Sequence, residues 1–409
     1  MMKKNKTSIK KFTVVDLFSG AGGMSLGFEQ SNGFQTIAAI DIWRPAIETL
    51  LYNHPHIARE FAICASVDDV FRENSEFSPI VEKLIDFEVD VVIGGPPCQG
   101  MSLAGKRLDS DPRNQLFKSF VKAVEVLQPK AFVMENVPGL LSSDGGKINR
   151  AILNAFAEIG YNHFDQHAPM VLKAETFGVP QIRRRLFYVG FRGDISPSFD
   201  AWPPKPTHQV HIRGKRETTP DLFALDDAAN SLPLPISVKE AISDLPAINS
   251  GQGADEMPYI KTNDLSDFQV KMRNWEHCPR LNEGPMIYNH EASRHTEKLI
   301  NLISKAEPGS SVDPKYTDSK KWDPNAPGYT VKALGAGGGS TNRRAFHYDP
   351  KQLRGSTIRE NARVQSFPDW YRFMGAKTHQ MSQVGNAVPP LLAKAIAHAL
   401  YEKLNNDEC

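Results

Sequence analysis

The first 192 residues alternate short runs rich in β-branched residues with stretches of helical apolar spacing. This alternation is typical of a mostly parallel sheet covered by helices on both faces, because parallel neighbours need crossover connections. The expected strands are 12–17, 36–41, 90–93, 131–135 and 186–191, and the expected helices between them include 114–127 and 147–159. The pattern therefore predicts a doubly wound α/β fold.

The pattern changes after Arg192, where prolines stand at positions 197, 203, 204 and 206. Helical spacing then returns only at 238–244, 292–305, 358–365 and 390–404. A chain of 409 residues is long for one domain, so we expect a second, smaller and irregular one. The expected division is 1–192 for the α/β domain, 193–376 for the irregular domain, and 377–409 for a segment that returns to the first.

Composition excludes some classes of protein. Lys and Arg total 48 against 47 Asp and Glu, so a contact with a polyanion must come from local patches. No apolar run approaches the roughly 18 residues of a membrane span, and no apolar stretch follows the basic N-terminus. The spacing of the four cysteines is not that of a metal site; they are Cys64, Cys98, Cys278 and Cys409. We expect a cytoplasmic chain with no membrane partner and no metal.

Glycines follow the first expected strand at 20, 22 and 23, and Asp41 ends the second. In an open α/β sheet, ligands lie beyond the carboxyl ends of the strands, where an acid can bind ribose hydroxyls. Ser25 occupies the third glycine position of the dinucleotide motif. We therefore expect a nucleoside cofactor without phosphate, while a tight strand–helix turn is the alternative.

Cys98 lies in the sequence GGPPCQG at the end of the strand 90–93. Two prolines before it fix the backbone and prevent regular structure, which favours a nucleophile over a small buried hydrophobe. Glu135 ends a neighbouring strand and is expected to act as a proton donor, the alternative being a solvated cap. No motif supplies the histidine of a cysteine protease.

Arg183 and Arg185 belong to the sequence QIRRR before the last expected strand. In an extended segment, residues two apart point the same way, so the pair is expected to offer cationic donors to a phosphate or a base edge. A charged surface strand is the alternative.

Together these residues resemble the DNA (cytosine-5) methyltransferase family, in its prokaryotic restriction–modification form. The similar motifs stand in family order across the first 192 residues and the last fifty or so: DLFSGAGG, GGPPCQG, ENV, QIRRR, RENARVQSFP and QVGNAVPP. The resemblance implies the Rossmann-like fold of S-adenosylmethionine-dependent methyltransferases, with 193–376 as a target-recognition domain.

The resemblance also implies S-adenosylmethionine as methyl donor. The residues that it assigns to cofactor binding are Phe18, Gly20, Gly22, Gly23, Asp41, Ile42, Leu116, Asn386 and Val388. One position departs from the family: where Gly-Asp-Ile is common, this chain has Ala65, Ser66 and Val67. Ser66, or Asp68 or Asp69 in its place, is then expected to contact the adenine, with Val67 beside it.

The implied reaction begins with addition of the Cys98 thiolate to carbon 6 of cytosine, which makes carbon 5 nucleophilic. Glu135 would bind ring nitrogen 3, Arg183 and Arg185 the base carbonyl and neighbouring phosphates, and Pro96 with Pro97 the base itself. The target must be flipped out of the duplex.

The expected DNA contacts include a loop at 99–117 that closes over the flipped base. Its contact residues are Gln99, Ser102, Lys106, Arg107 and Arg113. Arg343 and Arg344 are expected to read bases, a solvated basic face that touches only phosphates being the alternative.

The expected partner is double-stranded DNA, bound by a monomer, with a cognate restriction endonuclease acting on the same site without direct contact. The nearest alternative is a tRNA cytosine-5 methyltransferase on the same scaffold. Three other classes of function are less favoured, because each leaves Cys98, Glu135 or Arg185 unexplained. They are an inactive DNA-binding scaffold, a methylase of exocyclic amines and a nicotinamide dehydrogenase.

Overall fold

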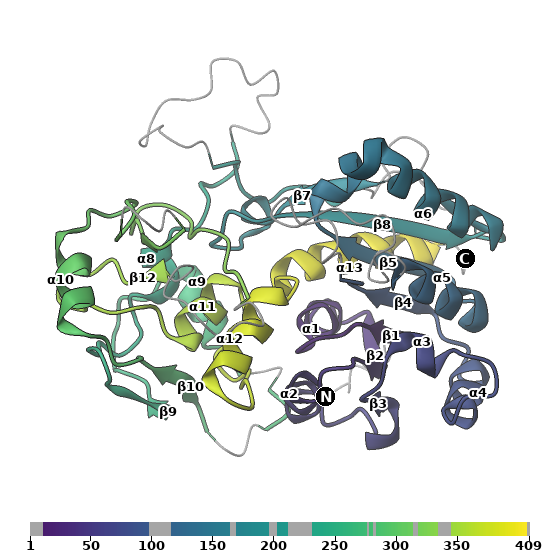
Figure 1. Cartoon of the computed structure of the whole chain (residues 1–409), viewed down its shortest axis with the longest axis horizontal. Coiled ribbons are helices and arrows are strands. Elements are labelled where there is room, and N and C mark those ends of the chain that lie inside the picture. The colour runs from purple at the N-terminus through teal and green to yellow at the C-terminus, as the bar shows by residue number, and fades with distance from the viewer. Residues whose placement is uncertain are drawn as a thin grey trace, which may run out of the picture.

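A computed structural model describes residues 11–97, 116–163, 169–195, 203–211, 231–275, 278–280, 284–313, 318–333 and 345–406. Figure 1 shows two parts: an α/β part on the right of the view and a less regular part on the left, joined by the helices α12 (Lys377–Asn386) and α13 (Pro390–Asn406).

An eight-stranded sheet forms the core of the α/β part. Its strands are β1 (Phe12–Leu17), β2 (Phe34–Ile40), β3 (Ala62–Ile63), β4 (Val91–Gly94), β5 (Ala131–Asn136), β6 (Tyr161–His163), β7 (Met170–Lys173) and β8 (Arg184–Arg192). The order is β3-β2-β1-β4-β5-β8-β6, and β7 also pairs with β8. The pairs from β3 to β5 are parallel, whereas β8 is antiparallel to its three neighbours. The predicted doubly wound, mostly parallel fold is confirmed.

Both faces of this sheet are buried, because apolar residues occupy successive positions along the central strands. In β1, Val14 packs into one hydrophobic cluster and Val15 into the other. The cluster of Val15 is covered by α2 (Arg44–Asn53), α3 (Val67–Val70), α4 (Ser78–Asp86), α5 (Leu116–Leu127) and α6 (Lys147–Glu158). The opposite face carries α1 (Gly23–Glu29) and α13. This two-sided burial explains why the strands read as continuous apolar runs.

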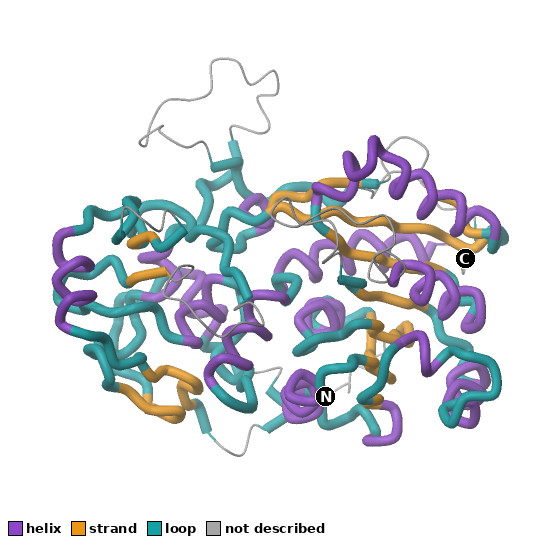
Figure 2. Tube along the Cα trace, in the orientation of Figure 1, coloured by secondary structure: helices purple, strands orange, loops and turns teal. Residues whose placement is uncertain are grey.

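The less regular part contains short elements, shown mostly as loop in Figure 2. They are α8 (Val238–Ile242), β9 (Gly253–Pro258), α9 (Asp267–Met272), β10 (Met286–Glu291), α10 (Glu297–Lys305), β11 (Lys320–Lys321), β12 (Ala345–Phe346), α11 (Ile358–Val364) and α12. The described residues also contain the short helices η1 (Arg59–Phe61), η4 (Pro138–Gly146) and η5 (Ala174–Phe177), and η4 is interrupted at 143–145. The predicted helix 292–305 was wrong at its start, because the Thr296 hydroxyl caps the helix by accepting from the Leu299 amide.

The C-terminal helix returns to the sheet, where α13 packs against α1 (Figure 1). The approach is close: a Cβ on Gly27 would lie 2.4 Å from the Pro390 carbonyl oxygen. Met381 and Val384 of α12 instead pack into the hydrophobic cluster of the irregular part. The predicted domain boundaries after 192 and 376 stay a prediction. Within the described residues, no helix is long and apolar enough to cross a membrane.

Candidate active site

Glu135 lies near the carboxyl end of β5, facing Arg185 of β8. Oε1 of the carboxyl group is 2.7 Å from the Arg185 Nε, and both side chains are largely buried. Burial raises the pKa of Glu135, and the charges of Arg185 and Arg183 oppose this rise without cancelling it. The site therefore holds an acid that keeps its proton to a higher pH than an ordinary glutamate.

The backbone after β4 runs directly past this acid. A Cβ on Gly95 would lie 2.9 Å from the Glu135 Oε2, so glycine leaves the space that the carboxyl group fills. The Asn136 side chain donates to the Pro96 carbonyl at 3.1 Å. Pro96 is buried and Pro97 exposed. The backbone at Gly95 and Pro96 therefore lies beside Glu135 and Asn136, and the assignment of Pro96 and Pro97 to base binding stays a prediction.

Several predicted site residues fall outside the described residues. They are Cys98, Gln99, Ser102, Lys106, Arg107, Arg113, Arg343 and Arg344.

Arg183 does not point toward the same atoms as Arg185. Its guanidinium is buried and donates to the backbone carbonyls of Val331, Gly385 and Ala387, each at 3.0 Å. Its terminal nitrogens thus bind the protein itself, and its expected contact with a base or a phosphate stays a prediction. Arg183 instead joins the start of β8 to the irregular part and to the end of α12.

The glycine loop after β1 has an unusual backbone. Phe18 and Gly20 both have φ of 54°, and Gly22 has φ of 80°. A Cβ on Gly20 would meet nothing within 4 Å, so the loop borders open space there. The buried Ser19 hydroxyl has no hydrogen-bond partner in the structure. A buried polar group without a partner is costly, and a ligand that binds at the loop can supply one.

Asp41 holds this loop from the end of β2. Its two carboxylate oxygens accept from the Gly20 amide and the Trp43 amide, each at 2.8 Å. Burial raises the pKa of Asp41. The next side chain, Ile42, is 74% exposed although it is a large hydrophobe. Each carboxylate oxygen keeps a second lone pair for a hydroxyl group, and Ile42 offers an apolar wall beside it.

The remaining predicted cofactor residues lie at element ends. Leu116 begins α5 and is half-buried, and Val67 is buried in α3. Asn386 is exposed at the end of α12, whereas the carbonyl of Val388 would lie 2.5 Å from a Cβ on Gly23. The C-terminal segment thus closes one side of the glycine loop.

Ser66 is the N-cap of α3. Its hydroxyl accepts from the Asp69 amide at 3.0 Å and donates to the Asp69 carboxylate at 2.7 Å. The Ser119 hydroxyl donates to Asp68 at 3.3 Å. All three candidates for the adenine contact are therefore already engaged, and the assignment among them stays a prediction.

A sequence model of the C-5 cytosine-specific DNA methylase family matches residues 12–402. The chain belongs to this family. It is 33% identical to Type II methyltransferase M.DdeI of Desulfomicrobium norvegicum over 96% of this chain and 90% of that protein. It is likewise 33% identical to Type II methyltransferase M1.HphI of Haemophilus parahaemolyticus, over 97% of this chain and 88% of the relative.

Solved structures of methyltransferases are also similar to this chain. A DNA modification methyltransferase encoded within an E. coli prophage matches with a TM-score of 0.74 and 28% identity, over 97% of this chain and 100% of that one. The S. pombe Dnmt2 methyltransferase shares the fold, with a TM-score of 0.55 and 15% identity, over 97% of this chain and 99% of that one. As a C-5 cytosine-specific DNA methylase, the chain methylates carbon 5 of cytosine in DNA. The tRNA alternative is not favoured.

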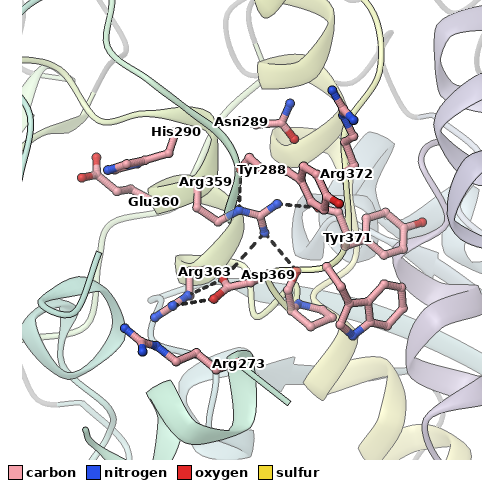
Figure 3. A network of polar contacts seen from close by, with 12 residues as sticks. Arg273, Tyr288, Asn289, His290, Arg359, Glu360, Arg363, Asp369, Tyr371 and Arg372 are labelled. Carbon is pink, nitrogen blue, oxygen red and sulfur yellow. Dashed lines mark hydrogen bonds and ion pairs between the residues drawn. The ribbon is translucent and has the colours of Figure 1, made fainter. Parts of the chain in front are cut away.

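Sequence reasoning assigned no role to four buried residues of this methylase. Arg359 donates to the carbonyls of Tyr288, Pro368 and Tyr371, and Arg363 binds Asp369 through two parallel hydrogen bonds (Figure 3). Gln181 donates to Gln365 at 2.9 Å. All four belong to motifs named in the sequence analysis: Asn136, Gln181, Arg359 and Arg363. Membership in a motif was therefore the sequence feature that could have identified them as important. The contacts described for these side chains are made within the protein.

Proposed function

We propose that this methylase binds S-adenosylmethionine at the glycine loop and transfers its methyl group to a cytosine that Cys98 has attacked at carbon 6. One observation supports this most: the proton-holding acid Glu135 lies against the Gly95–Pro97 backbone, and Cys98 is the next residue in the chain. Nucleophile and acid are thereby supplied from neighbouring strand ends.

The residues around the glycine loop fit this cofactor. Its charged amino-acid part can satisfy the unpartnered Ser19 hydroxyl and approach the backbone at Gly20. Its ribose can donate to Asp41, and its adenine can cover the exposed Ile42. When bound, the cofactor supplies an electrophilic methyl group.

The protein then has three tasks. The Cys98 thiolate forms a bond to carbon 6, and the ring electrons move toward carbon 5. Glu135 gives or shares its proton at ring nitrogen 3, which removes negative charge that would otherwise build on the ring. Arg185 holds the Glu135 carboxyl group through Nε and donates from Nη1 to the Arg184 carbonyl, which leaves Nη2 for the base carbonyl. After transfer, water takes the carbon 5 proton and the thiolate leaves carbon 6.

The substrate proposed is a specific duplex DNA sequence, with the cytosine flipped out and residues 193–376 recognising the target. Arg343 and Arg344 are the proposed base readers of this domain, and Gln99, Ser102, Lys106, Arg107 and Arg113 the proposed contacts of the loop. Both named relatives are Type II methyltransferases, which supports a place beside a restriction endonuclease of the same specificity. The monomeric state and cytoplasmic, nucleoid-associated location stay predictions.

Bisulfite sequencing of DNA from cells that express the chain tests the activity and reveals the target sequence. We expect protected cytosines at one recurring site. In vitro, the purified protein with labelled S-adenosylmethionine should modify duplex DNA and leave tRNA unlabelled. Label in tRNA alone would overturn the DNA assignment.

A further inference from the structure

A cluster of metal-ligating side chains lies at the ends of α1 and α2. Glu29 ends α1, His54 follows α2, and His56 stands two residues further on. The Glu29 carboxylate is 2.9 Å from the His54 Nδ1 and 3.0 Å from the His56 Nε2. The three ligand atoms lie within 4.8 Å of one another. The reaction proposed above uses none of these side chains.

A hydrogen bond on the far side of His54 fixes how its ring is protonated. The Tyr371 hydroxyl has one hydrogen, and its closest acceptor is the Ala21 carbonyl. The hydroxyl oxygen must then accept from the His54 Nε2, which lies 3.3 Å away. Nε2 therefore carries a hydrogen, and in a neutral imidazole Nδ1 has only a lone pair.

That lone pair would face a carboxylate oxygen, which also has only lone pairs. His54 is buried, with 1% of its side chain exposed, so water cannot separate the two groups. A positive charge between or on them removes the repulsion. It can be an added proton or a metal ion, and for a metal ion the second histidine on the same carboxylate offers a third ligand.

Two imidazoles and one carboxylate form a donor set that suits a borderline-soft divalent metal. Around a tetrahedral Zn²⁺ with bonds of ~2.1 Å, ligand atoms are ~3.4 Å apart. The two contacts of Glu29, at 2.9 and 3.0 Å, need to open by a few tenths of an ångström, and the remaining separation in the cluster is at most 4.8 Å. The hydrogen bond from His54 to Tyr371 is the outer contact that orients such a histidine.

The cluster is accessible from outside. Glu29 and His56 line a hollow of about 320 Å³, together with Lys11, Gln30, Asn53 and Trp370. The exposed fraction of the His56 side chain is 34%. The hollow provides an entry path, and its water can complete the coordination of the metal.

We propose that Glu29, His54 and His56 form a binding site for a divalent transition-metal ion of the Zn²⁺ class. The site joins α1 to the end of α2, and through Tyr371 it is linked to the backbone of the glycine loop at Ala21. Because the site links these elements and the reaction proposed above uses none of its side chains, we assign it a structural role.

The test uses the tag-free full chain after removal of metals with a chelator. Addition of Co²⁺ should give visible d–d bands that saturate at one ion per chain, without the near-ultraviolet band of a thiolate ligand. Zn²⁺ should displace Co²⁺ and raise the midpoint of thermal unfolding, because it binds only the folded state.

His56→Gln should weaken Co²⁺ binding about tenfold or more while the unfolding midpoint without metal stays near wild type, because His56 is partly exposed. Glu29→Gln should weaken it likewise. His208→Gln, at a half-buried histidine outside the cluster, is the matched control and should bind as the wild type does. Lack of stoichiometric binding in the wild type, equal binding in His56→Gln, or a thiolate band would overturn the proposal.

Discussion

Arg185 Nε lies 2.7 Å from Glu135 Oε1, so a permanent cation contacts the acid that we assign to proton donation. An arginine this close normally makes a carboxyl group more acidic, yet burial prevails and the pKa of Glu135 is raised. The pair thus keeps the acid oriented without removing its proton.

Glu135→Gln should slow methyl transfer by about 10²–10⁴-fold, because glutamine can donate a hydrogen bond but cannot share a proton with ring nitrogen 3. The wild-type rate should also fall on the alkaline side as Glu135 loses its proton, and this limb should vanish in the variant. Single-turnover rates across pH check both. Glu125→Gln, at an exposed glutamate paired with Lys122, is the control. A parallel fall in rate and DNA affinity would make Glu135 a binding residue.

Cys98→Ala should abolish methyl transfer while DNA binding remains, because the added bond at carbon 6 requires a thiolate. Wild-type protein should form a denaturation-resistant adduct with DNA that carries 5-fluorocytosine, since fluorine cannot leave as a proton does. Gel electrophoresis detects the adduct. Cys64→Ala should keep the activity. Turnover of the Cys98 variant near the wild-type rate would exclude covalent catalysis.

Gly23→Ala should destabilise the protein by about 1–3 kcal/mol, because the new methyl group would lie 2.5 Å from the Val388 carbonyl oxygen, a backbone atom that cannot easily move. Urea unfolding measures the loss, and cofactor affinity should fall with it. Gly139→Ala is the matched control, since a Cβ there meets nothing within 4 Å. Equal stability of the two variants would show that the loop and the C-terminal segment are not in close contact.

Asp16→Asn should weaken the pH dependence of stability. Burial raises the pKa of Asp16 to about 7, although the Ser25 hydroxyl donates to it at 2.6 Å. Because the folded state holds this proton more tightly than the unfolded chain, stability should fall as pH rises from about 4 to 7. The slope is about 1.4 kcal/mol per pH unit for one group.

The difference between wild type and Asp16→Asn isolates this slope from those of other groups. Denaturant unfolding at pH 5, 6 and 7 would reveal it. Identical slopes in the two proteins would show that Asp16 is ionised throughout.

The sequence predicted the sheet well because its strands are buried on both faces. β1 was predicted at its observed bounds, and β2 and β4 were misplaced by only one or two residues at their ends. It predicted the irregular part poorly, because short elements such as α9 and β10 depend on long-range contacts. The Tyr259 hydroxyl, for example, donates to Asp369 at 2.7 Å, across 110 residues.

The same distinction applies to the site. Glu135 and Asp41 could be placed because strand ends meet at one edge of a parallel sheet. Arg183 could not, because its partners at Val331, Gly385 and Ala387 are backbone carbonyls far along the chain. A motif shows which residues are special, but not whether they face the substrate or the protein.

The packing of α13 against α1 has a consequence for protein synthesis. The helix α13 leaves the ribosome long after the glycine loop and α1, because more than three hundred residues separate them in the chain. A nascent chain therefore carries β1 and α1 with an uncovered apolar face until α13 has emerged. Premature termination before residue 390 should therefore leave a polypeptide that aggregates and methylates nothing.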